Sequence, residues 1–173
     1  ICDLPYSLHD MAYDYAGKQL YVLYVKNSKT YLSTMDIYTG AITEVGTFDK
    51  RMLTISCTTE GQIYTISKDG ELCKVDKAKA TYDVVGKVSE TQSEDWVTLS
   101  YLQSMAYDHN TGKMYWYVFS YNGTTKKMIS RLDTVDLKTA ETKEIGTFDE
   151  ACEVSGLFIP YDGDLQITGT DQV

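Results

Sequence analysis

One pair of residues recurs at the same spacing three times along this chain of 173 residues. An aspartate is followed ten positions later by a glycine at Asp36–Gly46, Asp76–Gly86 and Asp136–Gly146. Internal repetition with a period of roughly 40–50 residues is typical of solenoids, propellers and other arrays. We therefore expect a series of similar units rather than one irregular core.

The start of each unit shows a second regularity, which supports the same division. The residues Met-Ala-Tyr-Asp at 11–14 return unchanged at 105–108. An apolar residue precedes a glycine by six positions in three places and by seven in a fourth: Met11–Gly17, Ile55–Gly61, Leu157–Gly163 and Met105–Gly112. Near the end of the chain, the spacing Leu157–Gly163 indicates the start of a fourth unit.

Each unit divides into four short segments that have the composition of strands. They are rich in Tyr, Val, Ile and Thr and are bounded by Gly, Asn and Asp, which are strand and turn signals. No apolar spacing of three and four persists over three turns, so we expect no substantial helix. Asp14, Asp108 and Asp36 directly precede turns, where their carboxylates can accept backbone N–H groups in Asx turns.

Four antiparallel strands per unit is the arrangement of a β-propeller blade. We predict an all-β, propeller-like domain over 1–173 with about three and a half four-stranded antiparallel blades. Blades 1, 2 and 3 run over about 7–48, 53–88 and 102–148, and an incomplete blade 4 over about 154–173. Propellers close with about 4–8 blades. We therefore expect a fragment of a longer propeller, which we favour because both termini interrupt the pattern, or half of a ring completed by another chain.

The third unit carries the clearest form of the repeat. It reads Met-Ala-Tyr-Asp-His-Asn-Thr-Gly-Lys-Met-Tyr at 105–115, Val-Asp-Leu-Lys-Thr-Ala at 135–140 and Ile-Gly-Thr-Phe at 145–148. This pattern resembles a repeat of exported propellers in modular surface or periplasmic proteins of gut-type Bacteroidetes. The resemblance covers nearly the whole chain, although the second unit departs from it with Ile-Ser-Cys-Thr at 55–58. It implies the fold and export to the periplasm or cell surface, and it implies no catalytic residue.

Composition and missing motifs narrow the possible partners. The net charge of −9 disfavours nucleic acid, whose binders carry a basic surface. No apolar run approaches the roughly 18 residues of a membrane span, so we expect no membrane insertion. The four cysteines Cys2, Cys57, Cys73 and Cys152 form no C-x-x-C pair, and we favour buried free thiols over disulfides. With no calcium-loop or phosphate-loop motif, we expect neither metal nor cofactor.

Candidate catalytic groups are sparse. The two histidines, His9 and His109, stand in no pattern that suggests a nucleophile triad. We therefore predict no catalytic residue and favour a non-enzymatic function. An alternative stays open, because paired carboxylates that face each other across a propeller channel can hydrolyse a glycosidic bond.

Loop length indicates which face binds a ligand. The glycine-to-aspartate interval varies (Gly17–Asp36, Gly61–Asp76 and Gly112–Asp136), and insertions that map to one face of a repeat protein mark its binding side. The candidate ligand-binding residues on that face are Trp96, Tyr101, Tyr121, Asn122, Arg51 and Asp49. We predict a binding or scaffold module that presents this face to a glycan or a protein. The alternatives are a hydrolytic propeller and a purely structural spacer.

Overall fold

The computed structural model describes residues 4–88, 98–99, 103–122, 126–149 and 152–161. In these ranges the chain forms thirteen strands and no helix, and accordingly no helix that could cross a membrane. All pairings between the strands are antiparallel. The predicted all-β class is therefore confirmed.

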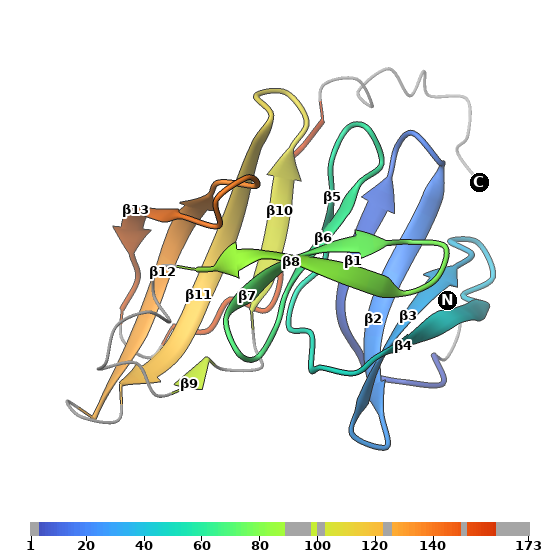
Figure 1. Ribbon diagram of the computed structural model, residues 1–173, viewed down its shortest axis with the longest axis horizontal. Helices are drawn as coiled ribbons and strands as arrows, with labels where there is room; N and C mark the ends of the chain where they lie inside the picture. The colour runs from blue at the N-terminus through green and yellow to red at the C-terminus, as the bar shows by residue number, and fades with distance from the viewer. Residues whose placement is uncertain (1–3, 89–97, 100–102, 123–125, 150–151, 162–173) are drawn as a thin grey trace.

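Three sheets of the same topology follow one another along the chain, each with its strands in sequential order (Figure 1). Blade 1 consists of β1 (Leu8–Asp14), β2 (Gln19–Lys26), β3 (Lys29–Met35) and β4 (Ile42–Phe48). Blade 2 consists of β5 (Ser56–Cys57), β6 (Ile63–Ile66), β7 (Glu71–Asp76) and β8 (Thr81–Lys87). Blade 3 consists of β10 (Ser104–Asp108), β11 (Lys113–Asn122), β12 (Lys127–Val135) and β13 (Thr142–Thr147). The short strand β9 (Thr98–Leu99) adds to the end of β11.

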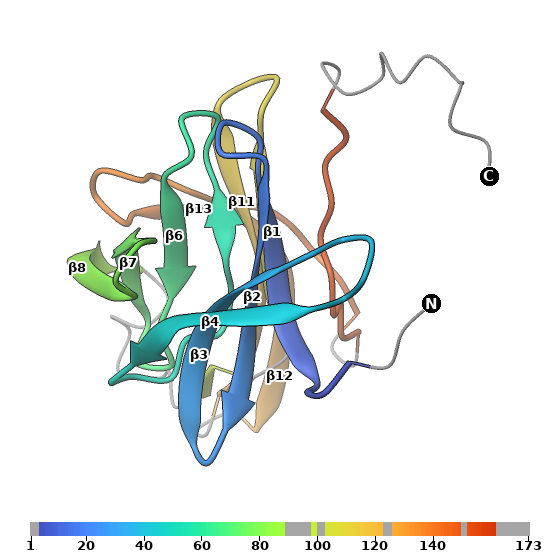
Figure 2. The same ribbon diagram turned by 90° about the vertical axis from the view of Figure 1, so that its right-hand side faces the viewer.

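The apolar residues are buried between neighbouring blades. One cluster joins blades 1 and 2 and includes Leu23, Leu32 and Ile63. A second cluster joins blades 2 and 3 and includes Leu72 and Trp116. Figure 2 shows the blades, between which these clusters lie, from the side. Blade 2 therefore contributes to both cores, while blades 1 and 3 each contribute to one.

Asp36 forms the predicted Asx turn, and Asp136 forms an equivalent turn in blade 3. The Asp36 Oδ1 accepts the N–H groups of Tyr38 at 2.9 Å and Thr39 at 2.8 Å. Asp136 Oδ1 accepts those of Lys138 and Thr139 at 2.7 Å and 3.0 Å. These turns lead directly into the outermost strands, and the repeated interval spans the turn and most of the strand that follows it.

The fourth residue after each aspartate takes a left-handed backbone conformation. The φ angle is 70° at Gly40, 54° at Ala80 and 63° at Ala140. Glycine adopts this region freely, whereas an alanine there carries a backbone cost of about 1 kcal/mol or more. Ala80 and Ala140 are both buried. Their methyl groups are therefore held in place by packing.

The glycines that end the first two intervals, Gly46 and Gly86, each receive that methyl group from the next blade. Each glycine follows a β-bulge in its outermost strand. A Cβ at Gly46 would lie 2.9 Å from the Ala80 Cβ, and one at Gly86 would lie 3.2 Å from the Ala140 Cβ. A side chain at Gly46 would overlap Ala80, and one at Gly86 would require Ala140 to shift. The interval thus carries both halves of a contact between neighbouring blades.

The described part of the predicted fourth blade is an extended segment. Residues 152–161 contain no assigned strand, and the remainder of the prediction, 162–173, lies outside the described residues. Cys57 and Cys73 are buried free thiols, and Cys152 is free and partly exposed. Cys2 lies outside the described residues.

Candidate functional site: a pocket at the innermost strands

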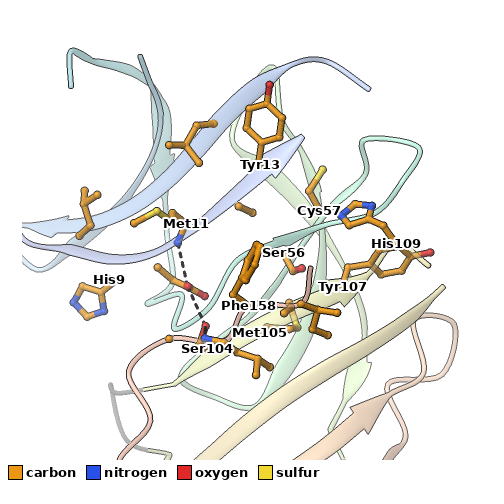
Figure 3. Close-up of a pocket in the computed structure, with 18 of the residues that line it drawn as sticks. His9, Met11, Tyr13, Ser56, Cys57, Ser104, Met105, Tyr107, His109 and Phe158 are labelled. Atoms are coloured by element: carbon orange, nitrogen blue, oxygen red, sulfur yellow. Dashed lines mark hydrogen bonds between the residues drawn. The ribbon is translucent and has the colours of Figure 1, made fainter. Parts of the chain in front are cut away.

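The innermost strands of the three blades surround a pocket of about 520 Å³. β1, β5 and β10 form its walls together with residues 155–159 (Figure 3). Figure 3 shows Phe158 in the middle of this space, with Met11 on the β1 side and Met105 on the β10 side. Phe158 is 78% exposed although it lines the pocket, so its ring is accessible to a ligand.

One carboxylate in the pocket wall joins all three blades. Asp10 Oδ2 accepts the Ile55 N–H of the blade 1–blade 2 linker at 2.9 Å. Asp10 Oδ1 accepts the Ser104 hydroxyl of β10 at 3.2 Å and the Met11 N–H at 3.0 Å. Ser104 Oγ in turn accepts the N–H of Leu157 at 3.1 Å. The Asp10 carboxylate therefore holds β1, the linker before β5 and β10 together in the pocket wall.

The electrostatics of this carboxylate are dominated by loss of water. Burial raises the pKa of Asp10 to about 7, against the lowering effect of the hydrogen bonds from Ile55, Met11, Ser104 and Met105. A carboxyl group of this kind changes its protonation state within the physiological range. Proton binding at this site is thus coupled to contacts among the blades.

An imidazole–guanidinium contact lies at one end of the pocket. The guanidinium of Arg51 donates to His9 Nε2 at 3.2 Å. Burial and the positive charge of Arg51 lower the pKa of His9, so the imidazole is held neutral and accepts the hydrogen bond. This pairing presents a hydrogen-bonding group next to the apolar walls.

Aromatic rings gather at the opposite end of the pocket. Tyr15 makes edge-to-face contacts with Tyr13 at 5.0 Å, His109 at 4.6 Å and Tyr161 at 5.1 Å between ring centroids. The ring of Tyr107 contacts His109 at 5.2 Å. His109 Nδ1 also lies 3.2 Å from the Thr59 hydroxyl. The histidine is therefore packed among rings from blades 1 and 3 and the segment 152–161.

The candidate residues of the predicted loop face lie in two places. Asp49 and Arg51 are on the linker after β4, where Asp49 Oδ1 accepts the Tyr82 hydroxyl at 2.6 Å and Arg51 contacts His9. Tyr121 and Asn122 end β11 and pair with β12. Tyr121 is 39% exposed and Asn122 is buried. Trp96 and Tyr101 lie outside the described residues.

The pocket itself was missed by sequence reasoning. Its aromatic end includes Tyr13 and Tyr107, which are equivalent positions of the repeated Met-Ala-Tyr-Asp motif. A tyrosine repeated at the same place on an innermost strand was the signal that could have indicated it. The motif by itself predicts strands and turns, because a strand pattern does not show which side chains meet across the blades.

The polar groups of the site do not assemble into a metal centre. In the described ranges, no group of three His, Cys, Asp or Glu side chains is placed to hold a metal ion. Asp10 is the one acidic residue among those that line the pocket there. The arrangement can accept hydrogen bonds and pack against flat or apolar surfaces.

Three four-stranded antiparallel blades around this pocket define a β-propeller-type fold. The same fold is found in solved structures. The chain is 14% identical to the propeller of nidogen in a nidogen/laminin complex, with a TM-score of 0.59 over 87% of this chain and 52% of that one. It is 16% identical to an oligogalacturonate lyase from Vibrio parahaemolyticus, with a TM-score of 0.52 over 85% of this chain and 41% of that one.

These similarities concern architecture. At such low identity they show a shared fold, and the chain spans about half or less of the length of each of these proteins. A second oligogalacturonate lyase structure, in complex with manganese, matches at a TM-score of 0.52 and 15% identity, over 85% of this chain and 41% of that one. No protein-family model and no curated protein matches the sequence.

Proposed function

We propose that the chain is a non-enzymatic binding module of an exported bacterial protein of the surface or periplasm, and that it binds a glycan in the pocket at its innermost strands. The observation that carries this proposal is the composition of the pocket walls. Aromatic and aliphatic side chains surround a cavity of about 520 Å³, and hydroxyl, imidazole and carboxylate groups lie among them. That size and lining are typical of small-ligand sites.

The rings suit a sugar better than they suit an extended apolar ligand. The C–H face of a pyranose packs against an aromatic ring, while its hydroxyl groups need hydrogen-bond partners nearby. Phe158 offers an exposed ring, and the Arg51–His9 pair and the Tyr15 and Tyr107 side chains supply polar groups at the two ends. Export rests on the resemblance of the repeat to exported propellers.

The hydrolytic alternative is less well supported. Glycoside hydrolysis ordinarily needs two carboxyl groups placed on either side of the bond that breaks. Among the described residues of the pocket wall, Asp10 is the one carboxylate, and its oxygens already accept hydrogen bonds from Ile55, Ser104 and Met11. These partners suit a structural role for Asp10.

A glycan array followed by calorimetry on the best hit tests the proposal. We expect binding that Phe158→Ala weakens at least about tenfold, or roughly 1.4 kcal/mol. Tyr38→Ala is the matched control, because Tyr38 is also a highly exposed ring, at 90%, but lies on the outer turn of blade 1. An array without hits would favour a spacer, and release of new reducing ends would favour the hydrolytic alternative.

A further inference from the structure

The glycine in the outermost strand contacts the turn of the next blade in two of the three blades, and in the third blade it has no such contact among the described residues. Gly46 and Gly86 each receive the methyl group of an alanine from the following blade. Gly146 occupies the equivalent position in β13, after the equivalent β-bulge. Among the described residues, no atom lies within 4 Å of the point where a Cβ of Gly146 would stand. Within the part of the chain that the structure describes, no neighbour of Gly146 explains why this position is a glycine.

The side chains around this open position are exposed in blade 3 and covered in blade 1. Phe148 is 44% exposed, whereas its equivalent Phe48 is 3% exposed. Ile145 is 54% exposed, whereas its equivalent Val45 packs against the core between blades 1 and 2. The face formed by Ile145, Gly146 and Phe148, here called the free face of blade 3, therefore has the composition of a surface between blades.

The segment that follows blade 3 makes a hydrogen bond equivalent to one made just before β5. There, the Ile55 N–H donates to Asp10 of the preceding blade. The Leu157 N–H donates to Ser104 in the same way, and Ser104 is the equivalent of Asp10 in β10. Ile55 and Leu157 are themselves equivalent, since each precedes a glycine by six residues.

The linker before that segment also follows the same route. After blade 1, the Met52 N–H donates to Thr30 Oγ1 at 3.2 Å. After blade 3, the carbonyl of Cys152 accepts the Ser130 hydroxyl at 2.8 Å. Thr30 and Ser130 are equivalent residues of β3 and β12, so both linkers cross the same place on a blade. Met52 and Cys152 thus occupy equivalent places beside their blades.

We propose that the free face of blade 3 is the docking surface for a fourth blade of the same repeat, with residues 154–161 as its innermost strand. Its outer turn places a small residue of positive φ on Gly146, as Ala80 does on Gly46. A second copy of this chain is not the occupant, because its own β1 would need the place beside β10 that residues 154–161 occupy.

Two lengthened versions of the chain test this assignment. In the first, Tyr161 is followed by a second copy of residues 60–88, because Thr59 of blade 2 is the equivalent of Tyr161. In the second, it is followed by residues 16–48 of blade 1. We expect at least one version to unfold in a single transition, at a midpoint about 4 °C or more above that of the chain itself.

The substitution Gly146→Leu identifies where the added blade sits. In the chain itself it should leave the midpoint within about 1 °C, since the position is open, and in the lengthened version it should abolish the gain. If neither addition raises the midpoint, or if Gly146→Leu is equally harmless in the lengthened version that gains stability, the proposal is wrong. It is also wrong if the chain itself sediments as a dimer that Gly146→Leu dissociates, because the occupant is then a second copy.

Discussion

Asp10 shows how a single side chain can connect several units of a repeat. Its carboxylate accepts hydrogen bonds from the linker before β5 and from β10, although it belongs to β1. Its equivalents in the other blades are Thr54 and Ser104, which are neutral. The acidic group is therefore found at this position in blade 1 alone, and the free-energy cost of burying its charge depends on pH.

The free energy of unfolding should fall as pH rises through the titration of Asp10. The group has a pKa of about 7 in the folded protein, above its ordinary value of 3.8, so the folded state holds more protons between these values. The stabilisation is complete below the lower value and is lost as pH rises past the higher one. We expect the loss between pH 5 and 8 to be on the order of 2 kcal/mol larger in the wild type than in Asp10→Asn.

Urea unfolding at a series of pH values measures this difference. Asp69→Asn is the control, because Asp69 is an aspartate whose side chain is 63% exposed. The pKa values of Asp36 and Asp136 are lowered by backbone N–H groups, so these groups affect stability at more acidic pH. Burial also raises the pKa of Asp133, and its contribution should remain in Asp10→Asn. A parallel pH dependence in wild type and Asp10→Asn would contradict the prediction.

At the scale of the element, the outermost strand and the turn before it form a matched pair across blades. The strand offers a glycine after a bulge, and the turn of the next blade offers a methyl group on a left-handed residue. Neither the glycine nor the left-handed alanine is explained by contacts within its own blade. A glycine in a strand usually weakens it, and an alanine of positive φ usually costs energy.

Exchanging the two residues between β4 and the turn after β7 tests this pairing. Gly46→Ala should destabilise the chain by about 1–3 kcal/mol through overpacking against Ala80. Ala80→Gly loses a buried methyl group worth about 0.8 kcal/mol, partly offset by relief of the backbone. The double variant places one methyl group back in the same space, and it should recover more than half of the loss caused by Gly46→Ala.

Chemical denaturation of the four proteins in this cycle provides the measurement. Gly146→Ala serves as the control, because the same change is made at the equivalent position where no described atom lies nearby. An additive cycle, in which Ala80→Gly does not rescue Gly46→Ala, would show that the two residues are not coupled.

At the scale of the whole molecule, stability should be graded across the blades. Blade 2 contributes to both apolar clusters, whereas the outer blades contribute to one each. In repeat proteins, stability is approximately a sum of terms for the units and for the interfaces between neighbours. The unit that has two interfaces should therefore open least often.

Hydrogen exchange checks this gradient. We expect the amides of β6 and β7 to exchange most slowly, and those of β3 and β12 to exchange faster, because opening an outer blade breaks one interface. Uniform protection across the three blades would contradict the gradient and would indicate one cooperative unit.

The periodic residues were sufficient to predict an all-β fold of four-stranded antiparallel sheets, because strand and turn chemistry is local. Alternating Tyr and Val residues, and glycines at the hairpins, specify strands without reference to the rest of the chain. The need for a glycine at position 46 was not predictable, because it arises from contact with Ala80 of another blade. The pocket was missed for the same reason: Asp10, Ser104 and Leu157 are far apart in sequence and meet once the blades are stacked.

The buried cysteines of blade 2 have a chemical consequence. Burial raises the pKa of Cys57 and of Cys73 to about 12, so neither side chain is a thiolate at neutral pH. Thiolates, rather than thiols, react with oxidants and alkylating reagents. We therefore expect both sulfur atoms to react slowly in an oxidising medium while blade 2 is closed. Each opening of that blade exposes them, so the modified fraction of Cys57 and Cys73 in an aged sample increases with the time that blade 2 has spent open.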